Sequence, residues 1–423
     1  MMAAPPTSTT GQRPSKLLNW LEASGAPAQK VSLATVDREG IEVDVTVATE
    51  PLAPGDIALA VPEHLIVSRW WLAVAVRGVA ELALLTLYLA YEKKRGKEGC
   101  FYPFIRELDR MQGRGSQGAK SPLLWEEGQV EELLAGSPVV GEIQERLRGI
   151  SKEFEELDTV WYLAGSLFNR QPFAPPTEQF SLKVFTQAFT AVQSSVVHLL
   201  GVPLGRRFAL VPLGPPLLTY SSTSKAMLKY DPETRQVQLA VDRAYQPGEP
   251  VLAWCGPQPN SKLLINYGIV DESNPHDRLP LSFTIPSSDP LYRQKRDVLA
   301  QHDLSTQQTF QLQRSAPLPP QLLPYLRVVF ATRAEDIAAA RFGEDAAPLI
   351  HLLRRRQAAY RTTIEQDDAI IADPTTGPRQ TVAARLLRIE KQILAGATQA
   401  ALALPGAAEA AALGPLPTAV KME

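Results

Sequence analysis

Apolar and polar residues alternate along one stretch near the start of the chain: Val43, Asp44, Val45, Thr46 and Val47. Side chains of a strand point alternately to opposite faces, so a repeat of two residues predicts a β-strand over 42–48 with one buried face. The stretches 30–36 and 56–61 are also typical of strands. A Pro-Gly pair before the third stretch marks a turn, so we expect three consecutive strands.

A long block of helical patterns follows. Five stretches have suitable composition and spacing: 82–95, 126–134, 138–157, 159–169 and 181–200. The first ends with Lys-Lys-Arg and then Gly96, which is typical of a helix C-terminus. Because strand patterns resume after the block, we interpret 79–200 as a helical insertion into a β-rich domain.

The stretch 206–268 returns to strand patterns and ends in a short helix. Four segments are typical of strands: 208–213, 226–230, 236–241 and 250–254. The second and third flank an Asp-Pro-Glu-Thr turn and predict a hairpin. A two-turn helix over 262–267 then ends with Tyr267, immediately before Gly268. This order places one phenol at the end of a folded-back chain.

The pattern becomes helical again after residue 277. Helices are expected over five stretches: 289–302, 320–331, 333–341, 347–361 and 381–400. Together they predict an all-α C-terminal domain. The residues that follow are rich in Ala, Pro and Gly, as in mobile low-complexity segments.

These patterns predict an α+β protein. A β-rich domain over 17–277 carries the helical insertion and precedes an all-α domain over 278–400, with a low-complexity tail over 401–423. Residues 1–16 contain no acidic side chain and several hydroxyls. We expect a disordered tail there, and the start of a transit peptide is the alternative.

Charge and composition exclude several classes of function. The chain has 423 residues, 45% of them hydrophobic, with 43 basic and 45 acidic side chains and a net charge of −2. This balance does not favour binding to nucleic acid or to an anionic membrane. Cys100 and Cys255 lie far apart and the histidines share no ligand spacing, so we expect no metal. The stretch 70–91 has membrane-spanning length but contains Arg77 and Glu81, which predicts a soluble protein.

One sequence motif is specific for a family. Residues 247–270 read P-G-E-P-V-L-A-W-C-G-P-Q-P-N-S-K-L-L-I-N-Y-G-I-V, and 274–277 read N-P-H-D. This string resembles the last part of the SET domain in protein-lysine methyltransferases of the Rubisco large-subunit type. The similarity covers about 20–394, and its C-terminal part, 360–394, resembles that family's helical substrate-binding domain. The strings R-F-A-L-V-P-L-G-P-P-L-L and W-C-G-P-Q-P-N resemble a plant and algal branch.

The resemblance implies a site for methyl transfer. In the family, S-adenosylmethionine and a neutral lysine amine meet in a narrow channel, and burial favours the neutral amine. Tyr267 matches the tyrosine that orients the amine, and Trp254, Cys255 and Asn266 are expected in the same pocket. Aromatic walls suit a sulfonium or a methylated ammonium. The alternative is that Tyr267 only ends a helix with its ring half-buried.

Several positions depart from the family pattern at the expected cofactor site. Val43 and Val45 stand where active relatives have a G-x-G loop, and their branched side chains stiffen the strand. Leu218 and Thr219 stand where relatives have an Asn-His pair that holds S-adenosylmethionine. Leucine has no hydrogen-bonding group. These substitutions predict weakened cofactor binding.

Two further departures affect the expected channel. Cys255 replaces a second family tyrosine, and Ser194-Ser195 replaces a Ser-Arg pair. A small buried residue filling the tyrosine site is a better interpretation of Cys255 than a reactive thiol, since no Lys, Arg or His lies within five residues.

Three functions remain open. The first preference is a SET-domain module with weakened or lost cofactor binding that binds a protein partner. The second is an active protein-lysine methyltransferase that uses S-adenosylmethionine on a non-histone protein substrate. The third is a remodelled pocket at Trp254 and Cys255 for another small ligand. The resemblance suggests a chloroplast location, with a soluble cytoplasmic protein as the alternative, and the sequence leaves the oligomeric state open.

Overall fold

The computed structural model describes residues 9–12, 15–38, 41–68, 80–114, 120–163, 181–199, 208–254, 256–338, 347–404 and 421–422. The chain divides into two compact units. Unit 1 consists of Met1–Glu126, Ile143–Gln258 and Lys262–Pro275, and unit 2 of Glu127–Glu142, Pro259–Ser261 and His276–Glu423. Unit 2 thus includes a segment that the sequence assigned to the helical insertion.

The first sheet of unit 1 has the strand order β1-β2-β3 and is antiparallel. Its strands are Thr9–Gln12, Val31–Arg38 and Ile41–Ala48. The predicted strands β2 and β3 are confirmed. The prediction of a disordered tail is wrong for Thr9–Gln12, because Thr9 pairs with Val36 of β2.

Both faces of β3 are covered. Val45 and Val47 are buried with Ala34, while Asp44 and Thr46 on the opposite face are also buried. The expected burial of the valine face is confirmed for Val45 and Val47, and the polar face is buried as well. Local periodicity detects alternation of residue types, but it does not reveal that a second layer covers the polar face.

The remaining strands that the structure describes in unit 1 form three small sheets. The orders are β4-β10-β9, β5-β7-β6 and β11-β8. Their bounds are Ile57–Pro62 (β4), Val67–Ser68 (β5), Val196–His198 (β6), Phe208–Leu210 (β7), Thr219–Tyr220 (β8), Leu228–Asp231 (β9), Gln236–Ala240 (β10) and Leu252–Ala253 (β11). The predicted hairpin is confirmed as β9 and β10, with Val237 opposite Tyr230. Strands β8 and β11 are parallel, which local sequence patterns do not predict.

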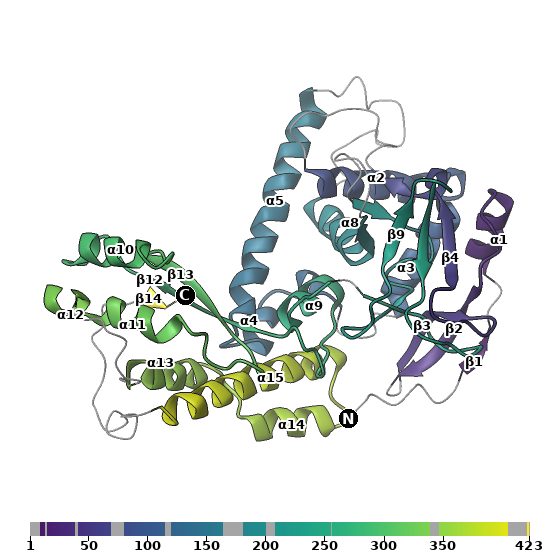
Figure 1. Cartoon of the computed structure of the whole chain (residues 1–423). Helices are drawn as coiled ribbons and strands as arrows, with labels where there is room; N and C mark the ends of the chain where they lie inside the picture. The colour runs from purple at the N-terminus through teal and green to yellow at the C-terminus, as the bar shows by residue number, and fades with distance from the viewer. Residues whose placement is uncertain are drawn as a thin grey trace. The chain divides into compact units, whose positions relative to one another are not determined.

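The helices described before residue 200 are α1 (Lys16–Ala23), α2 (Glu81–Arg95), α3 (Tyr102–Arg114), α4 (Gln129–Leu133), α5 (Val139–Leu163) and α8 (Leu182–Ser195), with 3₁₀ turns at Glu63–Leu65, Gly96–Glu98 and Pro122–Leu124. Helices α2, α3 and α8 pack against one another in unit 1 (Figure 1). The sequence did not predict α3, although Phe104 and Leu108 are buried at a helical spacing. The predicted helix over 159–169 coincides with α5 as far as Leu163, and its remainder lies outside the described residues.

Unit 2 combines a sheet with helices. Its strands are β12 (Leu279–Thr284), β13 (Gln307–Leu312) and β14 (Lys421–Met422), in the order β13-β12-β14. Its helices are α10 (Tyr292–Ala300), α11 (Leu322–Phe330), α12 (Ala334–Ala338), α13 (Ala347–Ala358), α14 (Ile364–Ala372) and α15 (Pro378–Leu402). Helices α13 and α14 pack against α15 (Figure 1).

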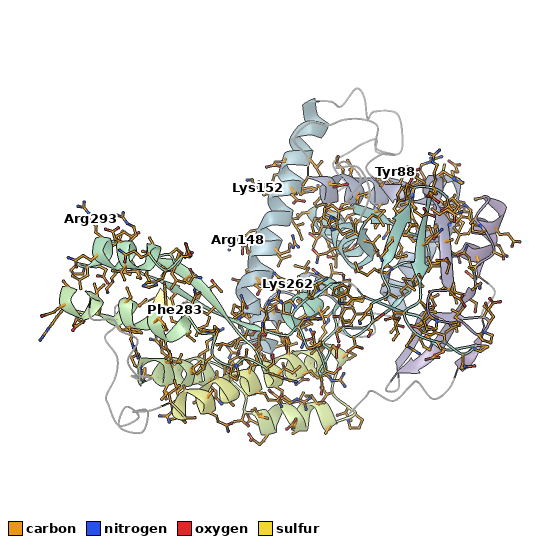
Figure 2. All side chains as sticks on the ribbon, in the orientation of Figure 1. Tyr88, Arg148, Lys152, Lys262, Phe283 and Arg293 are labelled. Carbon is orange, nitrogen blue, oxygen red and sulfur yellow. The ribbon has the colours of Figure 1, made fainter. Side chains whose placement is uncertain are left out.

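The prediction of an all-α C-terminal domain is wrong because β12 and β13 pair along their whole length. In β12 the buried residues Leu279, Leu281 and Phe283 alternate with more exposed ones. Phe283, labelled in Figure 2, forms an aromatic cluster with Phe310 and Tyr325. This cluster anchors the strand pair to α11, and burial raises the pKa of Tyr325 to about 12.

A second, polar cluster lies within unit 2. Glu390 of α15 accepts hydrogen bonds from the Ser137 hydroxyl (2.9 Å) and the Tyr360 hydroxyl (2.9 Å). The next residue along α15, Lys391, forms a fully buried ion pair with Asp367 of α14 (2.5 Å). Burial outweighs the two hydrogen bonds and raises the pKa of Glu390 to about 7.

Candidate functional site

The predicted short helix is α9, Asn260–Tyr267. Its first residue is fully buried, and both its backbone N–H and its side-chain amide donate to the Asp277 carboxylate, at 2.8 and 2.7 Å. These bonds satisfy donors at the helix start that have no partner within the helix. The helix buries Leu263, Leu264 and Ile265, whereas Lys262 faces solvent (Figure 2).

The other end of α9 is held equally firmly. The Ile265 carbonyl accepts hydrogen bonds from the Ser121 hydroxyl (2.6 Å) and the Gln193 side chain (3.4 Å). Gly268 follows with a φ of +69°, and a Cβ there would lie 2.6 Å from the backbone carbon of Lys120. Only glycine fits this conformation and this close approach. The position of Tyr267 is therefore fixed on both sides.

Tyr267 lies against a second tyrosine that the sequence did not identify. The Tyr220 and Tyr267 rings are nearly parallel, with centroids 6.4 Å apart and planes inclined by 23°. Tyr220 ends β8, which pairs with Leu252 and Ala253 of β11. Both rings are half-buried. We refer to Tyr220 and Tyr267 as the tyrosine pair, and it offers two aromatic faces to a cationic group.

Comparison with solved structures gives the fold of the whole chain. The SET domain of LSMT bound to lysine and AdoHcy has a TM-score of 0.73, with 20% identity over 91% of this chain and 90% of that chain. Rubisco LSMT bound to sinefungin and monomethyllysine has a TM-score of 0.74, with 21% identity and 92% coverage of both chains. Rubisco LSMT has also been solved with AdoMet, at a TM-score of 0.73.

This chain has the SET-domain fold of the Rubisco LSMT structures. Residues 286–394 match the family model described as Rubisco LSMT substrate-binding. The resemblance inferred from the sequence is thereby confirmed for the fold and for the C-terminal domain. The placement in a plant and algal branch stays a prediction.

Curated proteins also resemble the chain. It is 27% identical to the actin-histidine N-methyltransferase of Mus musculus over 196 residues, which is 41% of this chain and 33% of the mouse protein. The alignment with the Gallus gallus enzyme is longer, at 21% identity over 92% of this chain and 68% of that protein. The first alignment thus spans about a third of the relative's length. The chain is related to protein methyltransferases that use S-adenosylmethionine.

Within this SET fold, Leu218 is a core residue. Its side chain is 5% exposed and belongs to the main apolar cluster of unit 1. Its backbone N–H donates to the Gly214 carbonyl, and the neighbouring Thr219 N–H donates to Val251. The structure therefore presents a buried aliphatic group at the position that the resemblance assigns to a cofactor-binding asparagine.

The valines of β3 lie in an uninterrupted ladder. Val43 pairs with Val36 and Val45 with Ala34, in a register that continues from Ile41 to Ala48. On the other edge of β3, the backbone N–H of Thr46 donates to the Leu217 carbonyl (3.0 Å). The Thr46 carbonyl accepts from the backbone N–H of Val251 (2.9 Å). The backbone polar groups of Thr46 are thus engaged within the protein. The Val43 side chain lies outside the described residues.

Other predicted site residues have structural contacts. The Asn266 amide donates to the Gln258 side chain (3.1 Å), and Asn274 donates to the Gln258 carbonyl (2.8 Å). Asn266 therefore braces the loop before α9. The backbone N–H of Trp254 donates to the Ala226 carbonyl (2.8 Å), and the residue is half-buried. Cys255 lies outside the described residues.

The serines at the expected Ser-Arg position are also engaged. The hydroxyls of Ser194 and Ser195 both donate to the Ala191 carbonyl, at 3.1 and 2.7 Å. Leu218 and Val45, at two of the expected cofactor positions, are apolar and buried, and the hydroxyls of Ser194 and Ser195 bond within their own helix.

Two searches of the described residues have negative results. Among them, no set of three or more His, Cys, Asp or Glu side chains could hold a metal ion. None of the helices that the structure describes is both long and apolar enough to cross a membrane.

Proposed function

We propose that this chain is a SET-type module that recognises a protein partner and binds S-adenosylmethionine weakly or not at all. The burial of Leu218 in the core carries this proposal, because a core aliphatic residue cannot hydrogen-bond to the cofactor. Each cofactor group left without a partner would cost about 1–3 kcal/mol. Several such losses move a micromolar Kd to millimolar or weaker.

Two features support recognition of a protein. The match of 286–394 to a substrate-binding family model supports recognition of a protein by unit 2. In unit 1 the tyrosine pair presents near-parallel rings, which suit a lysine or methylated lysine side chain. The partner is thus a protein with a basic side chain accessible to the tyrosine pair. A chloroplast location stays a prediction from the resemblance.

An active protein methyltransferase is the second candidate, and the fixed position of Tyr267 favours it. When bound, S-adenosylmethionine would supply an electrophilic methyl group. Tyr267 would orient the accepting nitrogen through its hydroxyl, and Tyr220 would exclude water from one side of it. Burial would favour the uncharged form of an accepting amine. The names of the relatives suggest a lysine or histidine side chain as the acceptor.

Titration of the full chain with S-adenosylmethionine separates the two functions. A ligand at about 100 times its Kd adds about 2.7 kcal/mol to the stability of the unit that binds it. We expect no change in unfolding temperature at millimolar cofactor, and no transfer of labelled methyl to protein extracts. A clear increase in unfolding temperature together with labelled products would establish the enzyme and refute the module. Rubisco LSMT serves as the positive control.

A further inference from the structure

A short hydrogen bond joins the two chain segments that follow the tyrosine pair. Ser222 lies two residues after Tyr220, and Asp271 lies four residues after Tyr267. The Ser222 hydroxyl donates to the Asp271 Oδ2 atom at 2.5 Å. Both segments belong to unit 1. The two tyrosines are thus connected through their rings and, a few residues further on, through this bond.

The Asp271 carboxylate is oriented toward Ser222 by its own turn. Its other oxygen, Oδ1, accepts hydrogen bonds from the backbone N–H of Ser273 (2.9 Å) and from the Ser273 hydroxyl (2.8 Å). Ser222 is 5% exposed and Asp271 is partly buried, so water competes little for the bond. A hydrogen bond from a hydroxyl to an ionised carboxylate is about twice as strong as one between neutral groups. The bond is therefore a firm link between the two segments.

Each ring also has a support of its own. Ser121 and Gln193 hold the end of α9, and β11 holds the strand that ends at Tyr220. These contacts place each ring relative to its own neighbours, whereas the bond between Ser222 and Asp271 links the two segments directly. The attraction between a cation and a ring depends on the position of the cation over the ring face, and a binding site requires side chains held within about 0.5 Å. The relative position of the two rings is therefore the property that this bond controls.

We propose that Ser222 and Asp271 are positioning residues of the tyrosine pair. Their hydrogen bond holds the two rings in the relative geometry that receives a basic side chain of the protein partner, and neither residue contacts that side chain. The inference rests on the proposed function, because it identifies what supports the site that the proposed function uses. Without the bond the rings would have to be ordered on binding, which lowers affinity.

Five substitutions separate positioning from other roles. Ser222→Ala and Asp271→Ala each remove the bond. Ser222→Thr keeps the hydroxyl, and Asp271→Asn keeps a hydrogen bond with Ser222 without the charge, since an amide both donates and accepts. Ser224→Ala is the matched control, because Ser224 is also buried and lies in the same loop, but its hydroxyl donates to a different carboxylate, that of Asp242 (3.1 Å).

The first measurement follows the geometry of the tyrosine pair without any ligand. Light, a ruthenium photosensitiser and persulfate oxidise tyrosines to radicals, and two radicals in contact couple through a carbon–carbon bond. Mass spectrometry of the full chain, treated well below its unfolding temperature, gives the yield of the crosslink between Tyr220 and Tyr267. The yield is expected to fall about threefold or more in the two alanine variants at Ser222 and Asp271, and to stay at the wild-type level in the other three. No crosslink in wild type, or equal yields in all variants, would overturn the proposal.

The second measurement is calorimetric titration of the same variants with a trimethyllysine peptide. Affinity is expected to fall about threefold to tenfold in Ser222→Ala and Asp271→Ala, and to stay within about twofold of wild type in the other three variants. If Asp271→Asn lost as much affinity as Asp271→Ala, the carboxylate would pair with the bound cation itself, and the positioning role would be refuted.

The two measurements distinguish failure of this inference from failure of the proposed function. If the peptide binds wild type and both alanine variants equally, the positioning role is refuted and recognition of a basic side chain stands. If the peptide does not bind wild type while the crosslink depends on Ser222 and Asp271, the bond positions the rings and the proposed function is refuted.

Discussion

The Tyr220 and Tyr267 rings are inclined by only 23° and lie 6.4 Å apart between centroids, although 47 positions separate them in the chain. Each ring has its own support. Tyr267 ends a helix fixed by Ser121 and Gln193, and Tyr220 ends a strand paired with β11. The pair is therefore set before any ligand arrives, which limits the ordering cost of binding.

Removing either ring should weaken binding of a trimethyllysine peptide. Tyr220→Ala and Tyr267→Ala each remove one aromatic face, and a cation–π contact contributes about 0.5–2 kcal/mol, which corresponds to about twofold to thirtyfold in Kd. Tyr220→Phe and Tyr267→Phe keep the faces and should bind nearly as wild type. Calorimetric titration measures the difference, with Tyr102→Ala on α3 as the control. Equal affinity in all variants would exclude the tyrosine pair as the site.

Leu218→Ala should destabilise the protein. A buried leucine truncated to alanine leaves a cavity and lowers the free energy of unfolding by about 2–5 kcal/mol. Leu218→Met nearly preserves the volume and should cost less than about 1.5 kcal/mol. Urea unfolding of both variants provides the measurement. A loss below about 0.5 kcal/mol for Leu218→Ala would mean that the side chain is not part of the core and would remove the main support for weak cofactor binding.

Glu390 should make unit 2 less stable as the pH rises. Its folded pKa of about 7 exceeds the ordinary value of 4.5, so its stabilising contribution is complete below pH 4.5 and is lost as the pH rises through about 7. Burial also raises the pKa of Asp277, which acts in the same direction. Glu390→Gln should remove its own share, on the order of 3 kcal/mol, from the pH dependence of unfolding.

The measurement for Glu390 is the unfolding free energy at about pH 5 and about pH 8, since these values bracket most of the transition. Glu335→Gln, at an exposed position of α12, is the control and should keep the wild-type pH dependence. An identical pH dependence in Glu390→Gln and wild type would contradict the raised pKa.

Gly268→Ala should cost about 1–2 kcal/mol of stability, because an L-residue is strained at a φ of +69° and its Cβ would collide with the Lys120 backbone. Gly141→Ala on α5 has open space and should stabilise by roughly 0.5–1 kcal/mol. Thermal unfolding of the two variants gives the comparison. If Gly268→Ala were as stable as wild type, the end of α9 would not be held in the described position.

Local patterns predicted the parts of the fold that depend on neighbours in sequence. The hairpin of β9 and β10 follows from alternation around a turn, and Tyr267 follows from the helix that Gly268 ends. The partner of Tyr267 could not be predicted in this way, because the parallel pairing of Thr219 with Leu252 joins distant segments. Asn266 was expected in the pocket, yet its amide contacts Gln258, and this tertiary contact leaves no periodic signal.

The strands of unit 2 show a different limit. The run Leu279, Leu281 and Phe283 has the period of a strand, but it is short and includes a proline, so the surrounding helical patterns dominated. Its partner β13 is mostly polar and has little strand signal of its own. The pair forms because Phe283 and Phe310 meet Tyr325 in a common core.

The hydrogen bond from Ser137 to Glu390 has a practical consequence for dissecting the molecule. A fragment cut at residue 276 would keep the whole substrate-binding match but would lose Glu127–Glu142, including this donor and the Gln129 that accepts from Arg379. In such a fragment the Glu390 carboxylate would lose the Ser137 hydrogen bond and keep only the one from the Tyr360 hydroxyl. Expression of the C-terminal half should therefore succeed only when the missing peptide is supplied, either fused in permuted order or added in trans.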